Sequence, residues 1–170
     1  MTNTASFVIN GYLWAGPVKP GQTLLELLRD TMGLTGAKKG CDGGECGACV
    51  VLLNGQAVNS CLVLAADLLD DDEVTTIEGL PEDESMIIKQ AFVDVGAVQC
   101  GFCSPGMIVA AKAMLDTIPD PTYEDVEEAL VGHLCRCTGY VRTIQAVRLA
   151  AMRLKAQHST NTGGSECSEN

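Results

Sequence analysis

Eight of the nine cysteines fall into two sets of four, and this clustering constrains the fold more than any other feature of the chain. The sequence begins MTNTASFVINGYLW, which lacks the charged and apolar regions of an export signal, so we expect a cytoplasmic protein. Cytosolic thiols stay reduced, so the clustering predicts metal ligands rather than disulfides. The predicted ligands are Cys41, Cys46, Cys49 and Cys61 in the first set, and Cys100, Cys103, Cys135 and Cys137 in the second.

The first set lies in GCDGGECGACVVLLNGQAVNSC, with intervals of four and two residues before a distant fourth cysteine. This spacing is typical of plant-type [2Fe–2S] clusters. A tetrathiolate zinc site is the alternative, although structural zinc ligands usually come as two close pairs. Glycines between the ligands allow a tight loop that directs backbone N–H groups at sulfur, and they are Gly40, Gly43, Gly44 and Gly47.

The second set combines Cys100 and Cys103, in QCGFCSPGM, with Cys135 and Cys137, in HLCRCTGY. Two close pairs also describe a zinc site, so the spacing alone leaves zinc and a second [2Fe–2S] cluster open. For a cluster, we expect each close pair to bind one iron. A first redox centre favours a second one nearby, because electrons can then cross the protein in short steps.

Two polar residues beside this set allow more than one interpretation. His133 could be a ligand, as in Rieske-type centres, but four cysteines already complete the site. We therefore expect His133 to form hydrogen bonds or to pack. Arg136 could offset cluster charge or bind an anionic group of a partner, and it could equally be an ordinary surface arginine.

The first half of the chain is predicted to form strands and turns around one short helix. The pairs Asn10-Gly11 and Asn54-Gly55 suit type I′ hairpin turns. The capping-box sequence TLLE, starting at Thr23, begins a helix that Gly33 ends. The expected strands are residues 7–10, 12–14, 50–53, 56–58 and 74–77.

From residue 82 the hydrophobic pattern becomes helical, with Pro105 at a first helical position and Thr122 with Asp125 forming a cap. Four helices, at 85–95, 105–116, 123–131 and 143–157, suggest a small bundle. We therefore expect an α+β protein with a sheet domain at 1–80, a helical domain at 81–158 and a polar, mobile tail at 159–170, in which Cys167 is a bystander.

Charge and composition exclude several classes of function. Twenty-two acidic residues against eleven basic ones give a net charge of −11, and without a basic run this argues against nucleic-acid binding. No apolar stretch approaches the roughly 20 residues of a membrane span. No phosphate-binding loop is present, and the cysteines are already assigned to metal, so we expect no catalytic residues in this chain.

The motifs CDGGECGACVVLLNG with Cys61 and QCGFCSPGM with CRCTGY together resemble the iron–sulfur subunit of the molybdenum hydroxylases, over about residues 5–156. That family includes xanthine dehydrogenase, aldehyde oxidoreductase, carbon monoxide dehydrogenase and 4-hydroxybenzoyl-CoA reductase. The resemblance implies a β-grasp, ferredoxin-like domain and then a four-helix bundle, each holding one [2Fe–2S] cluster. It also implies that the chain is the electron-transfer subunit of an oxidoreductase.

The resemblance further implies two partner subunits, in a heterotrimer that pairs as (αβγ)2. The cluster on the second set would lie next to a molybdopterin in a large subunit, and the other would lie toward FAD in a medium subunit. Electrons would run from molybdenum through both clusters to the flavin. Gln99 matches the family glutamine that hydrogen-bonds the pterin, and a simple helix-end amide is the alternative.

The chain departs from the family pattern at His133, where asparagine is usual, and at Thr143, where isoleucine is frequent. Neither residue is a ligand, so these departures put only local packing and the potential of the second cluster in doubt. Two other functions stay open, a free two-cluster ferredoxin and a zinc-stapled interaction module. The helical half argues against a free carrier, and an EPR signal on reduction would exclude the zinc module.

Overall fold

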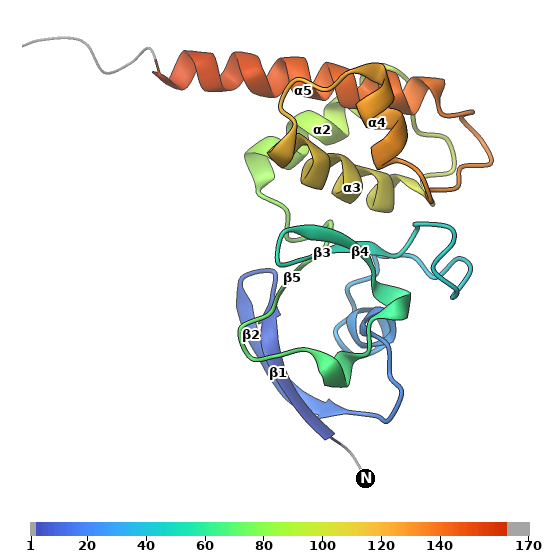
Figure 1. Ribbon diagram of the computed structural model, residues 1–170, viewed down its shortest axis with the longest axis vertical. Coiled ribbons are helices and arrows are strands. Elements are labelled where there is room, and N and C mark those ends of the chain that lie inside the picture. The colour runs from blue at the N-terminus through green and yellow to red at the C-terminus, as the bar shows by residue number, and fades with distance from the viewer. Residues whose placement is uncertain (1–2, 163–170) are drawn as a thin grey trace, which may run out of the picture.

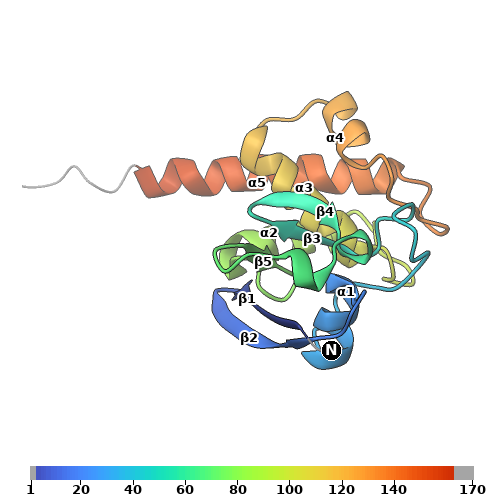
Figure 2. The same ribbon diagram turned by 60° about the horizontal axis from the view of Figure 1, so that its bottom comes forward.

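The computed structural model describes residues 3–162, and it shows a sheet domain below a layer of helices (Figure 1). The second view shows the same two layers (Figure 2). No helix within residues 3–162 has the length and apolar composition needed to cross a membrane. The predicted α+β class, with strands first and helices second, is confirmed.

The first half forms a five-stranded mixed sheet with the strand order β2-β1-β5-β3-β4. Strand β1 pairs with β2 in an antiparallel hairpin and with β5 in parallel, and β3 is antiparallel to both β4 and β5. A helical segment lies against the sheet and completes the β-grasp arrangement. The elements are β1 (Asn3–Ile9), β2 (Tyr12–Val18), α1 (Leu24–Glu26), η1 (Leu27–Thr31), β3 (Val50–Leu53), β4 (Gln56–Asn59), η2 (Ser60–Leu62), η3 (Ala65–Asp67) and β5 (Glu73–Thr75).

Both hairpin turns form as predicted. Asn10 and Asn54 each have φ of 51°, and the glycines after them also have positive φ, which is the type I′ geometry. The capping box at Thr23 is present, and its hydroxyl accepts a hydrogen bond from the Glu26 N–H at 3.2 Å. The first hairpin is longer than expected, whereas the last strand ends two residues earlier, at Thr75.

The four predicted helices are present as α2 (Glu82–Asp94), α3 (Ser104–Thr117), α4 (Tyr123–Ala129) and α5 (Val141–Thr162). Helix α3 begins one residue earlier than expected, so Pro105 is its second residue. Helix α5 continues into residues 159–162, which were expected to belong to the tail. The rest of that segment, including Cys167, lies outside the described residues, so its mobility stays a prediction.

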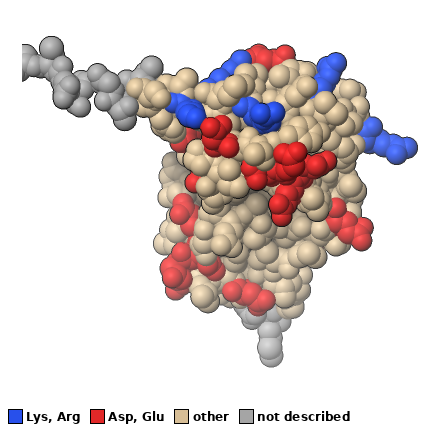
Figure 3. All heavy atoms as spheres, turned by 45° about the horizontal axis from the view of Figure 1, so that its top comes forward, with Lys and Arg blue, Asp and Glu red and all other residues tan. Residues whose placement is uncertain are grey.

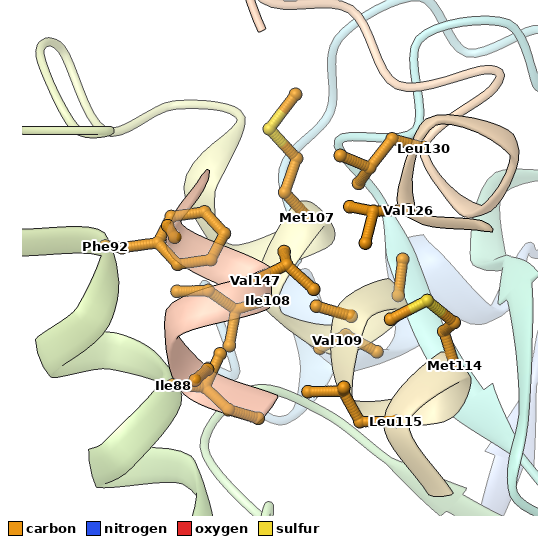
Figure 4. Packing of buried hydrophobic residues seen from close by; sticks show 14 of the residues in the cluster. Ile88, Phe92, Met107, Ile108, Val109, Met114, Leu115, Val126, Leu130 and Val147 are labelled. Atoms are coloured by element: carbon orange, nitrogen blue, oxygen red, sulfur yellow. The ribbon is translucent and has the colours of Figure 1, made fainter. Parts of the chain in front are cut away.

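Strand β3 joins the two halves because both of its faces are buried. Val51 packs in the core of the sheet domain, whereas Val50 and Leu52 point the other way, into the core of the bundle. This alternation follows from the period of two along a strand. The bundle core around Phe92 and Val147 is shown in Figure 4, where apolar side chains from all four helices meet. The division near residue 80 therefore crosses a shared core, and it stays a prediction.

Asn10 and Asn54, in the two hairpin turns, differ in the burial of the groups to which their side chains hydrogen-bond. Asn10 accepts a hydrogen bond from the Thr76 N–H at 2.8 Å and donates one to the Thr76 hydroxyl at 3.0 Å, and Thr76 is fully buried. Asn54 makes an equivalent pair, with the carboxylate of Asp72 and the N–H of Glu73, but both of these bonds are exposed to solvent.

We predict that Asn10→Ala destabilises the protein by about 2 kcal/mol or more, because the buried Thr76 N–H loses its acceptor. The matched variant Asn54→Ala has the same backbone strain, since φ is 51° at both positions, yet it leaves only exposed groups unpaired. It should cost about 1 kcal/mol or less. Thermal unfolding of the two variants measures the difference, and equal losses would contradict the role given to Asn10.

Candidate metal centres

The four thiols of the first set come together from two segments, as the spacing predicts. Cys41, Cys46 and Cys49 lie on the loop that precedes β3, and Cys61 lies on η2. The thiols of Cys41 and Cys46 interact with each other, and so do those of Cys49 and Cys61. The first pair faces outward, with Cys41 exposed, whereas Cys49 and Cys61 are buried.

Backbone N–H groups are directed at the outer sulfur of this set. Gly43 and Glu45 donate to the Cys41 sulfur at 3.4 and 3.3 Å. These donors favour the thiolate and lower the pKa of Cys41 to about 7. Burial, with the neighbouring Cys49 thiol, raises the pKa of Cys61 to about 11. The loop thus supplies the sulfur hydrogen bonds expected from its glycines.

The four thiols of the second set also converge, and they meet in a different pairing from the expected one. The sulfur of Cys137 lies 3.7 Å from that of Cys100, and the thiol of Cys103 interacts with that of Cys135. Each contact therefore joins one cysteine of each close pair. The chain bends at residues 136–138, and Cys135 and Cys137 contact different cysteines of the other pair.

The environment of the second set divides its thiols into an outer and an inner pair. Cys100 and Cys137 are exposed, whereas Cys103 and Cys135 are half-buried. Burial raises the pKa of Cys103 to about 12. Burial acts in the same direction on Cys135, but the hydroxyl and N–H of Thr138 outweigh it and lower the pKa of this thiol.

Both sets fit a two-iron cluster with two thiolates on each iron. In each set the thiols meet as two pairs, which is the ligand arrangement such a cluster needs. Among residues 3–162, no three His, Cys, Asp or Glu side chains gather at a position for a single metal ion. If clusters bind here, the pairs are Cys41 with Cys46, Cys49 with Cys61, Cys100 with Cys137 and Cys103 with Cys135.

Three residues around the thiols were not predicted from the sequence. The Asn59 amide donates to the Gly44 carbonyl at 3.0 Å, and its oxygen lies 3.7 Å from the Cys49 sulfur. The Thr138 hydroxyl is 3.0 Å from the Cys135 sulfur, and the Tyr140 hydroxyl accepts from the Cys135 N–H at 2.9 Å. The last two residues belong to the motif CRCTGY, in which the sequence predicted roles only for the cysteines and Arg136.

The two loops touch each other directly. The Leu134 N–H donates to the Cys46 carbonyl at 3.0 Å, so one hydrogen bond links the residue before Cys135 to a thiol residue of the first set. His133 is buried in the same place, and burial lowers the pKa of its ring, which is therefore neutral at pH 7. Its buried position fits packing, which is one of the two roles expected for His133.

The polar residues beside the outer pair lie at the surface. Gln99 is exposed, and its amide donates to the Cys137 carbonyl at 3.2 Å, so it lies next to the outer thiols of the second set. Arg136 is exposed as well. The surface position leaves both side chains accessible to a partner.

We predict that Thr138→Val lowers the reduction potential of the second cluster by about 40 mV, because a hydrogen bond of about 1 kcal/mol to a sulfur stabilises the reduced state. The matched control is Thr143→Val, since the Thr143 hydroxyl is buried and has no hydrogen-bond partner among the described residues. A redox titration followed by EPR measures both potentials. An unshifted potential in Thr138→Val would show that its hydroxyl does not act on the sulfur.

Comparison with known proteins agrees with this arrangement. Residues 7–78 match the 2Fe-2S iron-sulfur cluster binding domain, and residues 76–148 match the [2Fe-2S] binding domain. The chain is 47% identical over 151 residues to the small FeS subunit of nicotinate dehydrogenase from Eubacterium barkeri, covering 88% of this chain and 96% of that one.

Solved structures show the same fold. Quinoline 2-oxidoreductase from Pseudomonas putida 86 matches with a TM-score of 0.83 and 36% identity, over 91% of this chain and 97% of the matched chain. Aldehyde oxidoreductase from Desulfovibrio gigas matches with a TM-score of 0.85 and 40% identity, over 91% of this chain but only 17% of that longer chain. The protein therefore belongs to the family of iron–sulfur subunits of the molybdenum hydroxylases, with two [2Fe–2S]-binding domains.

Proposed function

We propose that this subunit relays electrons from a molybdopterin centre in a large partner subunit, through its two [2Fe–2S] clusters, to FAD in a medium subunit. The eight cysteines of the two sets hold the clusters, and the chain supplies the sulfur ligands and the hydrogen bonds that tune them. A bound [2Fe–2S] cluster accepts and releases one electron at a time. Substrate is transformed in the partner, and the complex is a cytoplasmic heterotrimer that pairs as (αβγ)2.

One observation carries this proposal: the backbones of the two thiol loops are hydrogen-bonded to each other, and each set also has at least one exposed thiol. The loops of both sets gather at the right-hand edge of Figure 1. Cys100 and Cys137 are exposed on one set and Cys41 on the other. A relay needs this combination, because electrons must enter and leave at the surface and cross between the centres within it.

The hydrogen bond from the Leu134 N–H to the Cys46 carbonyl supports transfer between the clusters. It directly connects the backbone next to Cys135 with the backbone of a first-set ligand, Cys46. Electronic coupling is stronger through bonds and close contacts than through solvent.

The surface around the outer thiols of the second set supports docking of the large subunit. Its exposed apolar side chains are unusual for a free surface, and patches of this kind mark interaction sites. No Asp or Glu occurs between residues 95 and 115 or between 129 and 162, although the net charge of the chain is −11. The apolar residues are Val98 (38% exposed), Phe102 (46%), Leu134 (61%) and Val141 (54%).

Figure 3 shows how charge is distributed on one face of the molecule. Acidic groups predominate in its middle and lower parts, whereas basic groups lie in its upper part and at its right-hand edge, with one acidic group among them at the top. We assign Gln99 to the docking surface, as a hydrogen-bond partner of the pterin, because it lies beside Cys137. We also assign Arg136 to this surface, where its guanidinium would bind an anionic group of the large subunit.

The relatives support a subunit over a free ferredoxin. The small FeS subunit of nicotinate dehydrogenase matches over nearly its whole length, and the aldehyde oxidoreductase carries the same fold within a longer chain. Both arrangements keep the two-cluster unit together with other parts of an oxidoreductase. The match to two [2Fe–2S]-binding domains likewise argues against the zinc-stapled module.

We predict that Cys137→Ser removes the second cluster, keeps the first and blocks reduction of the flavin by substrate in the assembled enzyme. The variant removes one outer ligand and leaves the first set untouched. Iron content should fall from four to about two per chain, and one EPR signal should disappear. Cys167→Ser is the control and should keep both clusters. Unchanged iron content and turnover in Cys137→Ser would contradict the assignment.

A further inference from the structure

We infer that His133 is a positioning residue whose ring holds the loop of the first thiol set at a defined separation from the loop of the second. The inference rests on the proposed function, because it concerns the coupling between two bound clusters. It adds a role for a buried side chain that is not among the predicted ligands.

The imidazole ring lies directly against the backbone of the first loop. A Cβ atom added to Gly47 would lie 2.6 Å from Cδ2 and 2.8 Å from Cγ of His133, so only a glycine leaves room for the ring there. Gly47 follows Cys46, and His133 lies two residues before Cys135. The ring of His133 thus contacts the loop of the first set, whereas the backbone of His133 is part of the loop of the second set.

The bundle fixes the ring from the other side. The His133 N–H donates to the Leu130 carbonyl at 3.0 Å, which anchors its backbone to the end of α4. The Gly106 carbonyl on α3 also faces the ring. A Cβ atom added to Gly106 would lie 2.2 Å from the Gly47 carbonyl oxygen, so α3 and the first loop meet backbone to backbone. The His133 ring therefore lies beside a direct contact between the backbones of Gly47 and Gly106.

The ring acts mainly through its volume. The backbone carbonyls of Leu130, Val131 and Gly106 face it, but neither ring nitrogen meets hydrogen-bond geometry with a partner among the described residues, although the side chain is only 8% exposed. His133 lines two grooves of about 420 Å³ each, one between the β3–β4 hairpin and α3, the other between α4 and the start of α5. Because open space adjoins the ring on these sides, a smaller residue would let the two loops shift.

Electron transfer and magnetic interaction between two centres both fall steeply with their separation. A residue that sets the distance between the loops of Cys46 and Cys135 therefore sets the coupling between the clusters. Changing its volume should alter this coupling while leaving the ligands of each cluster unchanged.

The test uses the full-length chain, loaded with iron and sulfide and fully reduced, with low-temperature EPR as the measurement. Interaction between the two reduced clusters splits their signals. We expect His133→Leu, which has a similar volume and no ring nitrogen, to retain the splitting. His133→Val should reduce it and His133→Ala should reduce it further. Val131→Ala is the matched control on the same loop, because Val131 is 77% exposed, and its splitting should equal that of the wild type.

The outcomes separate this inference from the proposed function. A wild-type chain with fewer than four irons would overturn the proposed function. Wild-type protein that carries both clusters but shows no splitting would overturn the positioning role alone, as would full splitting in His133→Ala at full iron content. If His133→Ala does not take up iron, the comparison of His133→Leu with His133→Val decides. Equal splitting in these two variants would contradict a role based on volume.

Discussion

The direct contact between the backbones of the two thiol loops is the constraint on which the rest of the structure depends. At Gly47 and Gly106 a loop of the sheet domain meets α3 without a side chain between them, and the Leu134 N–H bonds to the Cys46 carbonyl. Strand β3 reinforces this junction because it is buried on both faces. The two halves are consequently held in one relative position, which a relay between two centres requires.

Metal binding also has a structural consequence for domains of this size. Each half contains about 80 residues, and a single apolar core of that size is only marginally stable without added cross-links. The second set joins the start of α3 to the loop before α5, and the first set joins the loop before β3 to η2. A cluster in each place would tie together segments that are far apart in the sequence. Assembly of the clusters and stability of the fold are therefore coupled.

Local signals in the sequence predicted most of the elements and both thiol sets. The Asn-Gly turns and the capping boxes at Thr23 and Thr122 work within a few residues, and the cysteine spacing identifies a known cluster type. The thiol pairing of the second set was missed because it depends on a bend after Cys135. The contacts of Asn59 and His133 depend on residues brought together only by the fold, so no local pattern reveals them.

The most direct measurement is Mössbauer spectroscopy of the 57Fe-loaded protein, combined with iron and acid-labile sulfide analysis. Two [2Fe–2S] centres predict four irons and four sulfides per chain, with all iron in antiferromagnetically coupled pairs. A colourless protein containing zinc, or one in which iron is bound singly by four thiolates, would contradict the account.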